Sequence, residues 1–471
     1  MNKLNLSIAG THKDLKEKKY SVTELVKYYL ARIAKYDKNL NSFLTVTTDY
    51  ALKAARKQDN LLVSQGEGVF EDFPLFGVVT AFKDLYLTEG IRTTAASRVL
   101  ENFIPQYSST VVKKLENAGC ILIGKTNCDA WAHGASGENS DFGPIKNPWN
   151  KDFVPGGSSS GSAVSVASDF CLVALGTDTG GSVRQPASFC GVTGLKPTYG
   201  LVSRFGVVAM ASSLDCMGHL TNNVGDSRRV LEVTKGQDQF DSNIQSVKLA
   251  GEVRDIKKIT IGLPKDYFGQ GLDNQVRTKV LAAARFFEKQ GAKIVDVDLP
   301  HTKYATSVYY IIQPAEVASN LGRYDGIRYG LSRDSFGDEA KRRIMLGSYV
   351  LSSGYYDRYY LKAARVRTKL IEDFDKAFAK VDVLLAPVSP TPPFKLGEKT
   401  ADPLSMYLAD VYTVSANLVG VPGLALPAGF SDQGLPIGFQ LISQKFHENM
   451  LFDLGEIFQR NTDYHSQKPK L

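Results

Sequence analysis

Short apolar runs alternate with stretches of helical periodicity along most of the chain. Each run is bounded by polar residues or glycine, as is typical of buried strands. The runs lie at residues 76–82, 120–124, 170–175, 258–263, 293–299 and 381–386. Strands that alternate with helices predict an α/β fold, in which helices cover both faces of a central mixed, largely parallel sheet.

Local signals predict where several helices begin and end. Ser21 and Glu24 have the spacing of a capping box ahead of an apolar helical face, so a helix is expected to begin there. Further helices are predicted over 51–59, 110–118 and 275–290, and Gly119 is expected to end the second of these. Polar residues predict a surface loop over 60–72. The polar stretch 240–256 is either a domain boundary or another surface loop.

The composition is that of a folded protein with a large core. Of the 471 residues, 43% are hydrophobic and 22% are charged. No apolar run approaches the roughly 18 residues of a membrane span, and the opening MNKLNLSIAG lacks the apolar centre of a signal peptide. We therefore expect a cytoplasmic protein without membrane contact. The five cysteines show no C-x-x-C spacing, which indicates buried thiols and no structural zinc site.

Basic residues are concentrated near the N-terminus. The net charge is +7, and residues 1–60 hold 12 Lys and Arg against 6 Asp and Glu. A solvated helical face accounts for this excess, and contact with RNA or an acidic partner is the alternative. No RNA-binding motif accompanies the charge.

Two familiar motifs occur in contexts that do not support them. Residues 119–126 (GCILIGKT) match the phosphate-loop pattern, yet the residues between the glycines are apolar and fit a strand better. Residues 157–161 (GSSSG) match the nucleophile elbow of α/β-hydrolases, yet a loop and not a strand precedes them. We therefore expect neither a phosphate-binding loop nor an α/β-hydrolase site.

Two glycine- and serine-rich clusters carry the candidate chemistry. They are PGGSSSGS (155–162) and GTDTGGS (176–182), with a predicted helix and strand between them. Glycine lets the backbone approach a bound group and present N–H donors to it. The second cluster follows a strand, which places Ser182 at the carboxyl edge of the sheet, where open α/β sheets have their sites.

Lys83 is the candidate base for a serine nucleophile. A serine needs a base at neutral pH, and no histidine lies in a recognisable triad context. Lys83 follows the strand predicted at 76–82, and serine–lysine pairs are a known variant of the catalytic triad. The lysine would have to be neutral, so burial must lower its pKa from the usual value of about 10.4.

The chain resembles the amidase signature family over nearly its whole length. The resemblance rests on GVVTAFKDL (77–85), GKTNCDAWAHG (124–134), NPWNKDFVPGGSSSGSA (147–163) and GTDTGGSVRQPASFCGVTGLKPTYGLVSRFG (176–206). It implies the amidase signature fold as a single large domain over residues 1–471. The implied parts are a basic helical segment (1–60), a catalytic core (76–230) and a remainder (257–471) that completes the sheet and holds specificity elements.

The resemblance also implies a catalytic relay. Ser182 is similar to the family's acyl-forming nucleophile, Ser158 to the bridging serine in a cis peptide, and Lys83 to the general base. The implied oxyanion donors are the backbone N–H groups of Thr179, Gly180, Gly181 and Ser182.

Three residues stand out against the family pattern. Ser160 lies where the family usually has glycine, and it would be strained if the position required a positive φ. We expect this serine to alter the tuning of the site and not to abolish activity. The sequence offers no physical explanation for Trp131 and His133.

The second half of the chain is similar to the glutaminase subunits of tRNA-dependent amidotransferases. The similar segments are 309–330, 337–347, 351–357 and 402–407. This resemblance implies that Tyr309, Arg343 and Asp410 hold the charged end of glutamine, since an arginine can grip its α-carboxylate and an aspartate can pair with its α-ammonium.

The same resemblance implies a division of labour between subunits. This chain would release ammonia from glutamine, and partner subunits B and C would use it to amidate glutamate, or aspartate, on mischarged tRNA. ATP and magnesium would belong to the partner, so neither a cofactor nor a metal is expected in this chain.

Two other functions stay open at this point. A stand-alone amidase for a small aliphatic or aromatic amide would leave Arg343 and Asp410 as surface charges. A catalytically silent binding subunit would have no need of Ser182, Ser158 and Lys83, which are all present.

Overall fold

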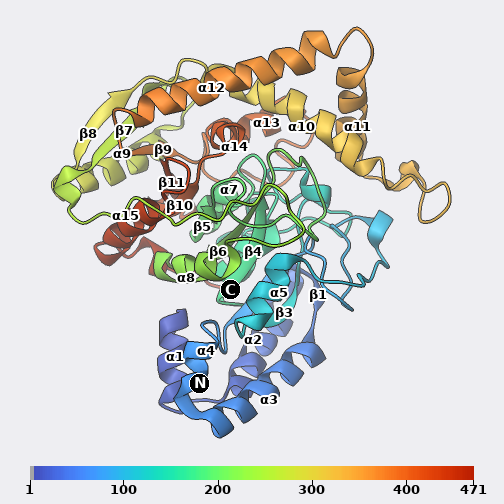
Figure 1. Cartoon of the computed structure of the whole chain (residues 1–471), viewed down its shortest axis with the longest axis vertical. Helices are drawn as coiled ribbons and strands as arrows, with labels where there is room; N and C mark the ends of the chain where they lie inside the picture. Colours follow the sequence, from blue (N-terminus) through green and yellow to red (C-terminus); the bar gives the residue numbers. More distant parts are fainter. Residues whose placement is uncertain (1–4) are drawn as a thin grey trace.

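One eleven-stranded sheet runs through the computed structural model, which describes residues 5–471 (Figure 1). The spatial order of the strands is β1-β3-β2-β4-β6-β5-β10-β11-β9-β7-β8. Strands from both sides of the polar stretch 240–256 belong to this sheet. The first four residues of the opening MNKLNLSIAG, and of the basic segment 1–60, lie outside the described residues.

The bounds of the elements are as follows. The strands are β1 (Phe43–Val46), β2 (Val79–Lys83), β3 (Ile121–Thr126), β4 (Val173–Asp178), β5 (Thr193–Lys196), β6 (Cys216–Thr221), β7 (Thr260–Pro264), β8 (Lys293–Val297), β9 (Val383–Pro387), β10 (Gly423–Phe430) and β11 (Pro436–Ser443). The helices are α1 (Ile8–Lys16), α2 (Val22–Tyr36), α3 (Thr48–Gln65), α4 (Val69–Asp72), α5 (Thr110–Asn117), α6 (Ser160–Ala167), α7 (Arg184–Cys190), α8 (Val224–Thr234), α9 (Asn274–Lys289), α10 (Ala305–Leu321), α11 (Asp338–Leu351), α12 (Lys362–Phe378), α13 (Pro403–Tyr407), α14 (Val414–Val419) and α15 (Glu448–Arg460).

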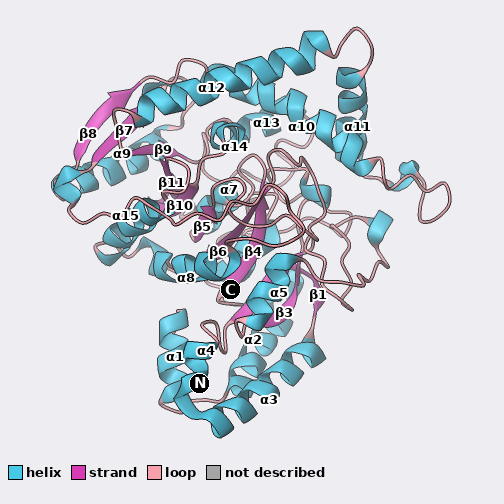
Figure 2. Cartoon of the chain, in the orientation of Figure 1, coloured by secondary structure: helices cyan, strands magenta, loops and turns pink. Residues whose placement is uncertain are grey.

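Helices cover both faces of the sheet (Figure 2). Gly218 of β6 faces Val183 at the start of α7, and the ring of the next residue, His219, contacts Ser227 of α8. Because successive residues of a strand point to opposite faces, α7 and α8 lie on opposite sides of the sheet. The predicted α/β fold with a mixed central sheet is confirmed.

Parallel pairing occurs in two separate groups of strands, β3-β2-β4 and β9-β7-β8. The strands between these groups pair antiparallel. The expectation of a largely parallel sheet therefore holds for the two groups only. The sequence prediction omits β1, β5, β6, β10 and β11, which contain glycine or proline or are short, features that weaken a strand signal. Antiparallel neighbours such as β10 and β11 need only a tight turn between them.

The predicted strands are all present, displaced by up to three residues. The run at 76–82 becomes a strand only at Val79, because Gly77 has a φ of +73° and turns the chain. The glycine, lysine and threonine at 124–126 lie inside buried β3, so the rejection of a phosphate-binding loop is confirmed. No strand directly precedes Gly157, so the rejection of an α/β-hydrolase elbow is confirmed as well.

The N-terminal region is more helical than predicted. The capping box is present: the Ser21 hydroxyl accepts from the Glu24 N–H at 3.1 Å, and the Glu24 carboxylate accepts from the Ser21 N–H at 2.7 Å. The loop predicted over 60–72 is wrong, since α3 continues to Gln65 and α4 follows. Polar residues dominate that stretch, but Val69 and Phe70 are buried in the core, and their burial stabilises the helical turn.

Candidate active site

Lys83 and Ser158 meet at the carboxyl edge of the sheet. Parallel strands β2 and β4 end side by side, at Lys83 and Asp178 respectively. Fully buried Lys83 places its Nζ 2.8 Å from Ser158 Oγ, 3.1 Å from Ser159 Oγ and 2.9 Å from Thr177 Oγ1. The structure therefore brings the predicted base and the predicted bridging serine into hydrogen-bond contact.

Burial shifts the protonation equilibrium of Lys83. It lowers the pKa of the side chain from 10.5 to about 8, although nearby Cys128 and Asp129 oppose the shift. A lysine with this pKa is neutral in a useful fraction of molecules near neutral pH. A lysine that acts as a base requires such a shift, and the burial of the end of β2 provides it.

Ser158 follows a cis peptide bond from Gly157, the geometry that the family resemblance implies. The next residue connects it to the second cluster, because the Ser159 N–H donates to the Ser182 carbonyl oxygen at 3.1 Å. The two glycine- and serine-rich clusters are thus in direct contact, although 24 residues separate their key serines in the sequence.

Asp178 anchors the loop that carries Ser182. Its carboxylate accepts from the Gly181 N–H at 2.9 Å and from the Arg184 Nε and Nη2 at 3.0 and 3.1 Å. Burial alone would raise the pKa of Asp178, but the buried Arg184 guanidinium outweighs that effect and holds the pKa at about 2. Asn417 donates a further hydrogen bond at 3.0 Å. Sequence reasoning missed Asp178 and Arg184 as site residues, although both lie in or beside the GTDTGGS cluster.

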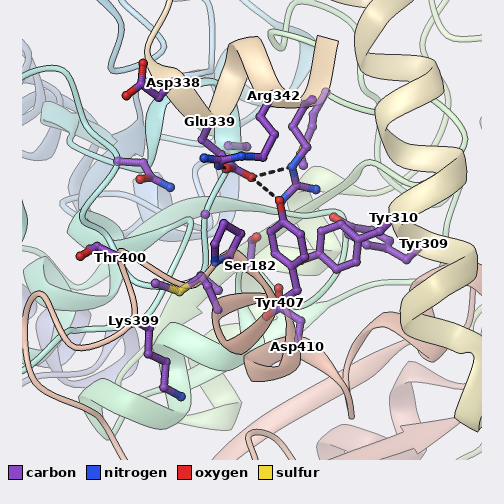
Figure 3. Close-up of a pocket in the computed structure, with 18 residues that line it drawn as sticks. Ser182, Tyr309, Tyr310, Asp338, Glu339, Arg342, Lys399, Thr400, Tyr407 and Asp410 are labelled. Atoms are coloured by element: carbon purple, nitrogen blue, oxygen red, sulfur yellow. Dashed lines mark hydrogen bonds and ion pairs between the residues drawn. The ribbon is translucent and has the colours of Figure 1, made fainter. Parts of the chain in front are cut away.

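A cavity of about 210 Å³ opens beside Ser182 (Figure 3). Ser182 is 9% exposed and forms part of its wall. The wall also contains Tyr309, Arg343 and Asp410, which come from α10, α11 and the turn after α13. Residues far apart in the sequence therefore meet around one space, as the resemblance implied for a bound glutamine.

Arg343 and Asp410 are buried side chains and not surface charges. Their exposed fractions are 3% and 8%. Burial raises the pKa of Asp410 well above its usual range. Its Oδ1 atom has no hydrogen-bond partner among the residues that the structure describes. An arriving cation would supply the missing partner and favour the ionised carboxylate.

The glycines of the second cluster allow close packing beside Ser182. A Cβ added at Gly180 would lie 2.8 Å from the Tyr309 hydroxyl oxygen, and one added at Gly181 would lie 2.3 Å from Thr413 Oγ1. Gly181 also has a φ of +137°. Only glycine fits these two positions without displacing Tyr309 or Thr413.

The structure explains two of the three residues that depart from the family pattern. Ser160 has no positive φ and begins α6, so the strain considered for it is absent. Trp131 does have a positive φ, of +58°, and its ring packs against Tyr324 and Phe336 in a buried cluster. Nothing among the described residues explains His133, whose buried ring nitrogens have no partner there.

Comparisons with known proteins place the chain in a family. The sequence profile of the amidase family matches residues 24–452. The chain belongs to the amidase family. It is 50% identical to the A subunit of the glutamyl-tRNA(Gln) amidotransferase of Carboxydothermus hydrogenoformans and 47% identical to that of Geobacter metallireducens, in each case over 99% of both chains.

Solved structures agree with this assignment. The A subunit of the glutamyl-tRNA(Gln) amidotransferase of Thermotoga maritima superposes with a TM-score of 0.83 at 36% identity, covering 100% of this chain and 98% of that one. A bacterial aryl acylamidase of the amidase signature family superposes with a TM-score of 0.86 at 26% identity, covering 98% and 97%. Members of one fold act on different amides, so the cavity has to decide the substrate.

Two kinds of feature are absent from residues 5–471. They contain no group of three or more His, Cys, Asp or Glu side chains arranged to hold a metal ion. Among the helices of the same residues, none combines the length and the apolar character needed to cross a bilayer.

Proposed function

We propose that this chain is the glutaminase subunit of a tRNA-dependent amidotransferase. The observation that carries the proposal is the cavity that joins Ser182 to Arg343 and Asp410. One side of the cavity supplies Ser182 as the nucleophile. The other side supplies Arg343 for the α-carboxylate and Asp410 for the α-ammonium of a free amino acid. A fatty or aromatic amide carries neither charge. It would leave the buried side chains of Arg343 and Asp410 without charged partners, which is unfavourable.

The proposed reaction proceeds through an ester on Ser182. Neutral Lys83 takes a proton from Ser158, which takes one from Ser182, and the Ser182 Oγ attacks the side-chain amide carbon of glutamine. The C–N bond breaks, the leaving nitrogen takes up the proton, and ammonia departs. Water then attacks the γ-glutamyl ester, which releases glutamate and restores Ser182. The 2.8 Å contact between Lys83 and Ser158 supports the first transfer.

Backbone N–H groups next to Ser182 are the proposed oxyanion donors. The resemblance suggested Thr179, Gly180, Gly181 and Ser182, but the Gly181 N–H already donates to Asp178. For the other N–H groups, the hydrogen bonds within residues 5–471 include no acceptor. We assign the stabilisation of the oxyanion to these, at about 3–4 kcal/mol for one such donor.

The names of the relatives suggest what becomes of the ammonia. Those proteins are amidotransferase subunits that act with glutamyl-tRNA(Gln). In our proposal, subunits B and C bind the mischarged tRNA in the cytoplasm. ATP and magnesium act in the partner, and this chain contributes the glutaminase step alone.

The test compares two nitrogen sources in the complex of this chain with its co-expressed partner subunits. Wild type should amidate Glu-tRNA(Gln) with either glutamine or ammonium chloride. The Ser182→Ala complex should do so with ammonium chloride only. Aliphatic and aromatic amides should release little ammonia compared with glutamine. Faster release from a simple amide than from glutamine would identify a stand-alone amidase instead.

A further inference from the structure

Arg343 is held in place by two side chains that sequence reasoning did not assign. Its Nε donates to Glu339 Oε1 at 2.7 Å, and its Nη1 donates to Gln313 Oε1 at 2.7 Å. Gln313 lies on α10, one turn after Tyr309, and Glu339 lies on α11, one turn before Arg343. The two helices pack closely, since a Cβ added at Gly347 would lie 1.9 Å from the Pro314 carbonyl oxygen.

Aromatic rings fix the guanidinium further. Its Cζ lies 4.5 Å from the centre of the Tyr310 ring and 4.6 Å from that of Tyr407. The Tyr407 hydroxyl donates to Glu339 Oε1 at 3.1 Å, so Glu339 receives hydrogen bonds from Tyr407 and from Arg343 together (Figure 3). A guanidinium is a rigid fork of five N–H donors, and these contacts fix its plane.

One edge of the guanidinium is left without a protein partner. The described residues provide acceptors for Nε and Nη1 of Arg343, but none for Nη2. Arg343 lines the cavity beside Ser182. An anion that enters the cavity would therefore meet a donor whose orientation is already set.

We propose that Glu339 is a positioning residue for glutamine, which acts by holding Arg343 so that Nη2 meets the substrate α-carboxylate. This inference rests on the proposed function. Glu339 also neutralises the buried guanidinium while the cavity is empty, which avoids the cost of an unpaired buried charge. Without Glu339, the long arginine side chain would regain rotamer freedom and lose its alignment on substrate binding.

The test compares glutamine with 4-aminobutanamide, which keeps the amine and the scissile amide but lacks the carboxylate. Glu339→Ala should raise the KM for glutamine about 10- to 100-fold, the effect of losing hydrogen bonds to a charged group, with a far smaller change in kcat. Glu339→Gln keeps an acceptor for Nε and should raise this KM less. Neither variant should change kcat/KM for 4-aminobutanamide by more than about twofold.

Asp338→Asn is the matched control, because this exposed acid lies at the edge of the same cavity and makes no hydrogen bond to Arg343. It removes the same charge and should leave the KM for glutamine within about twofold of wild type. Calorimetry of glutamine binding to each variant in a Ser182→Ala background gives the same comparison without turnover. A KM rise of the same size for both substrates, or none for glutamine, would overturn the positioning role.

Arg343→Ala distinguishes a failure of the positioning role of Glu339 from a failure of the proposed function. If it raises the KM for glutamine and Glu339→Ala does not, the inference fails and the proposed function stands. If neither variant affects glutamine, the carboxylate grip of the proposed function fails with it. Equal loss of stability in Glu339→Ala and Glu339→Gln, with unchanged discrimination between the substrates, would show a purely structural role.

Discussion

The two sides of the cavity differ in how complete they are before any substrate binds. On the catalytic side, Lys83 contacts the hydroxyls of Ser158, Ser159 and Thr177. On the binding side, the buried Asp410 Oδ1 has no partner among the described residues. In the proposed function, this difference means that Lys83 and Ser158 are arranged before the substrate binds, whereas a charged ligand would complete the binding side.

The two sides also differ in origin. The catalytic side comes from the segment 83–184, where two parallel strands end beside each other. The binding side brings together α10, α11 and the turn after α13. Changes on the catalytic side should therefore affect stability or kcat, and changes on the binding side should affect KM. Four substitutions or profiles test this division, from the largest expected effect to the smallest.

Asp178→Asn should cost the most stability. It leaves the buried Arg184 without its charged partner, and breaking a buried ion pair costs about 3–5 kcal/mol. Urea unfolding measures the free energy directly. Asp375→Asn, at an exposed position of α12, is the control, with an expected change of at most about 0.5 kcal/mol. Equal effects of the two substitutions would show that Asp178 does not anchor the Ser182 loop.

Asp410→Asn should weaken glutamine binding about tenfold or more and leave the fold stable, because the amide cannot pair with an ammonium as a carboxylate does. The raised pKa of Asp410 provides a second measurement, the release of a proton when glutamine binds. Burial favours the protonated carboxyl group in the empty cavity, and a bound ammonium would favour the ionised form, so the account predicts that glutamine binding releases a proton. Calorimetry in buffers of different ionisation enthalpy detects this proton in wild type. A similar release from Asp410→Asn would contradict the assignment.

The pH profile of ammonia release tests Lys83. If neutral Lys83 acts as the base, as proposed, kcat/KM should rise about tenfold per pH unit below its pKa and level off above about 8. The same group affects stability with a defined sign. Its pKa is lowered from 10.5 to about 8 on folding, so the unfolded chain binds more protons between these values and stability rises with pH there. A profile that is flat between pH 6 and 8 would rule out Lys83 as the base.

Ser160→Gly should have the smallest effect. The serine hydroxyl is buried without a partner among the described residues, and its backbone is helical. Removing the hydroxyl relieves an unpaired group, while glycine in a helix costs about 0.5–1 kcal/mol, so the two effects largely offset each other. We expect stability within about 1 kcal/mol of wild type and ammonia release within about twofold. A large gain in activity would show that the serine does impair the site.

The sequence predicts the catalytic side better than the binding side for a physical reason. The apolar runs predict β2 and β4, and the position of Lys83 directly after an apolar run already places it at a strand end. Strain at Ser160 could not be predicted from the sequence, because it depends on the φ angle of the folded backbone. The role of Glu339 could not be predicted either. It depends on the packing of α10 against α11 and on the position of Tyr407, which no local sequence pattern encodes.

The most direct test of the central claim is to locate the covalent intermediate. Turnover of isotope-labelled glutamine by the complex would be quenched in acid, and the digested chain would be analysed by mass spectrometry. The account predicts a γ-glutamyl ester on the peptide that contains Ser182, absent from Ser182→Ala. Label on a different residue, or ammonia release from glutamine by Ser182→Ala at the wild-type rate, would contradict it.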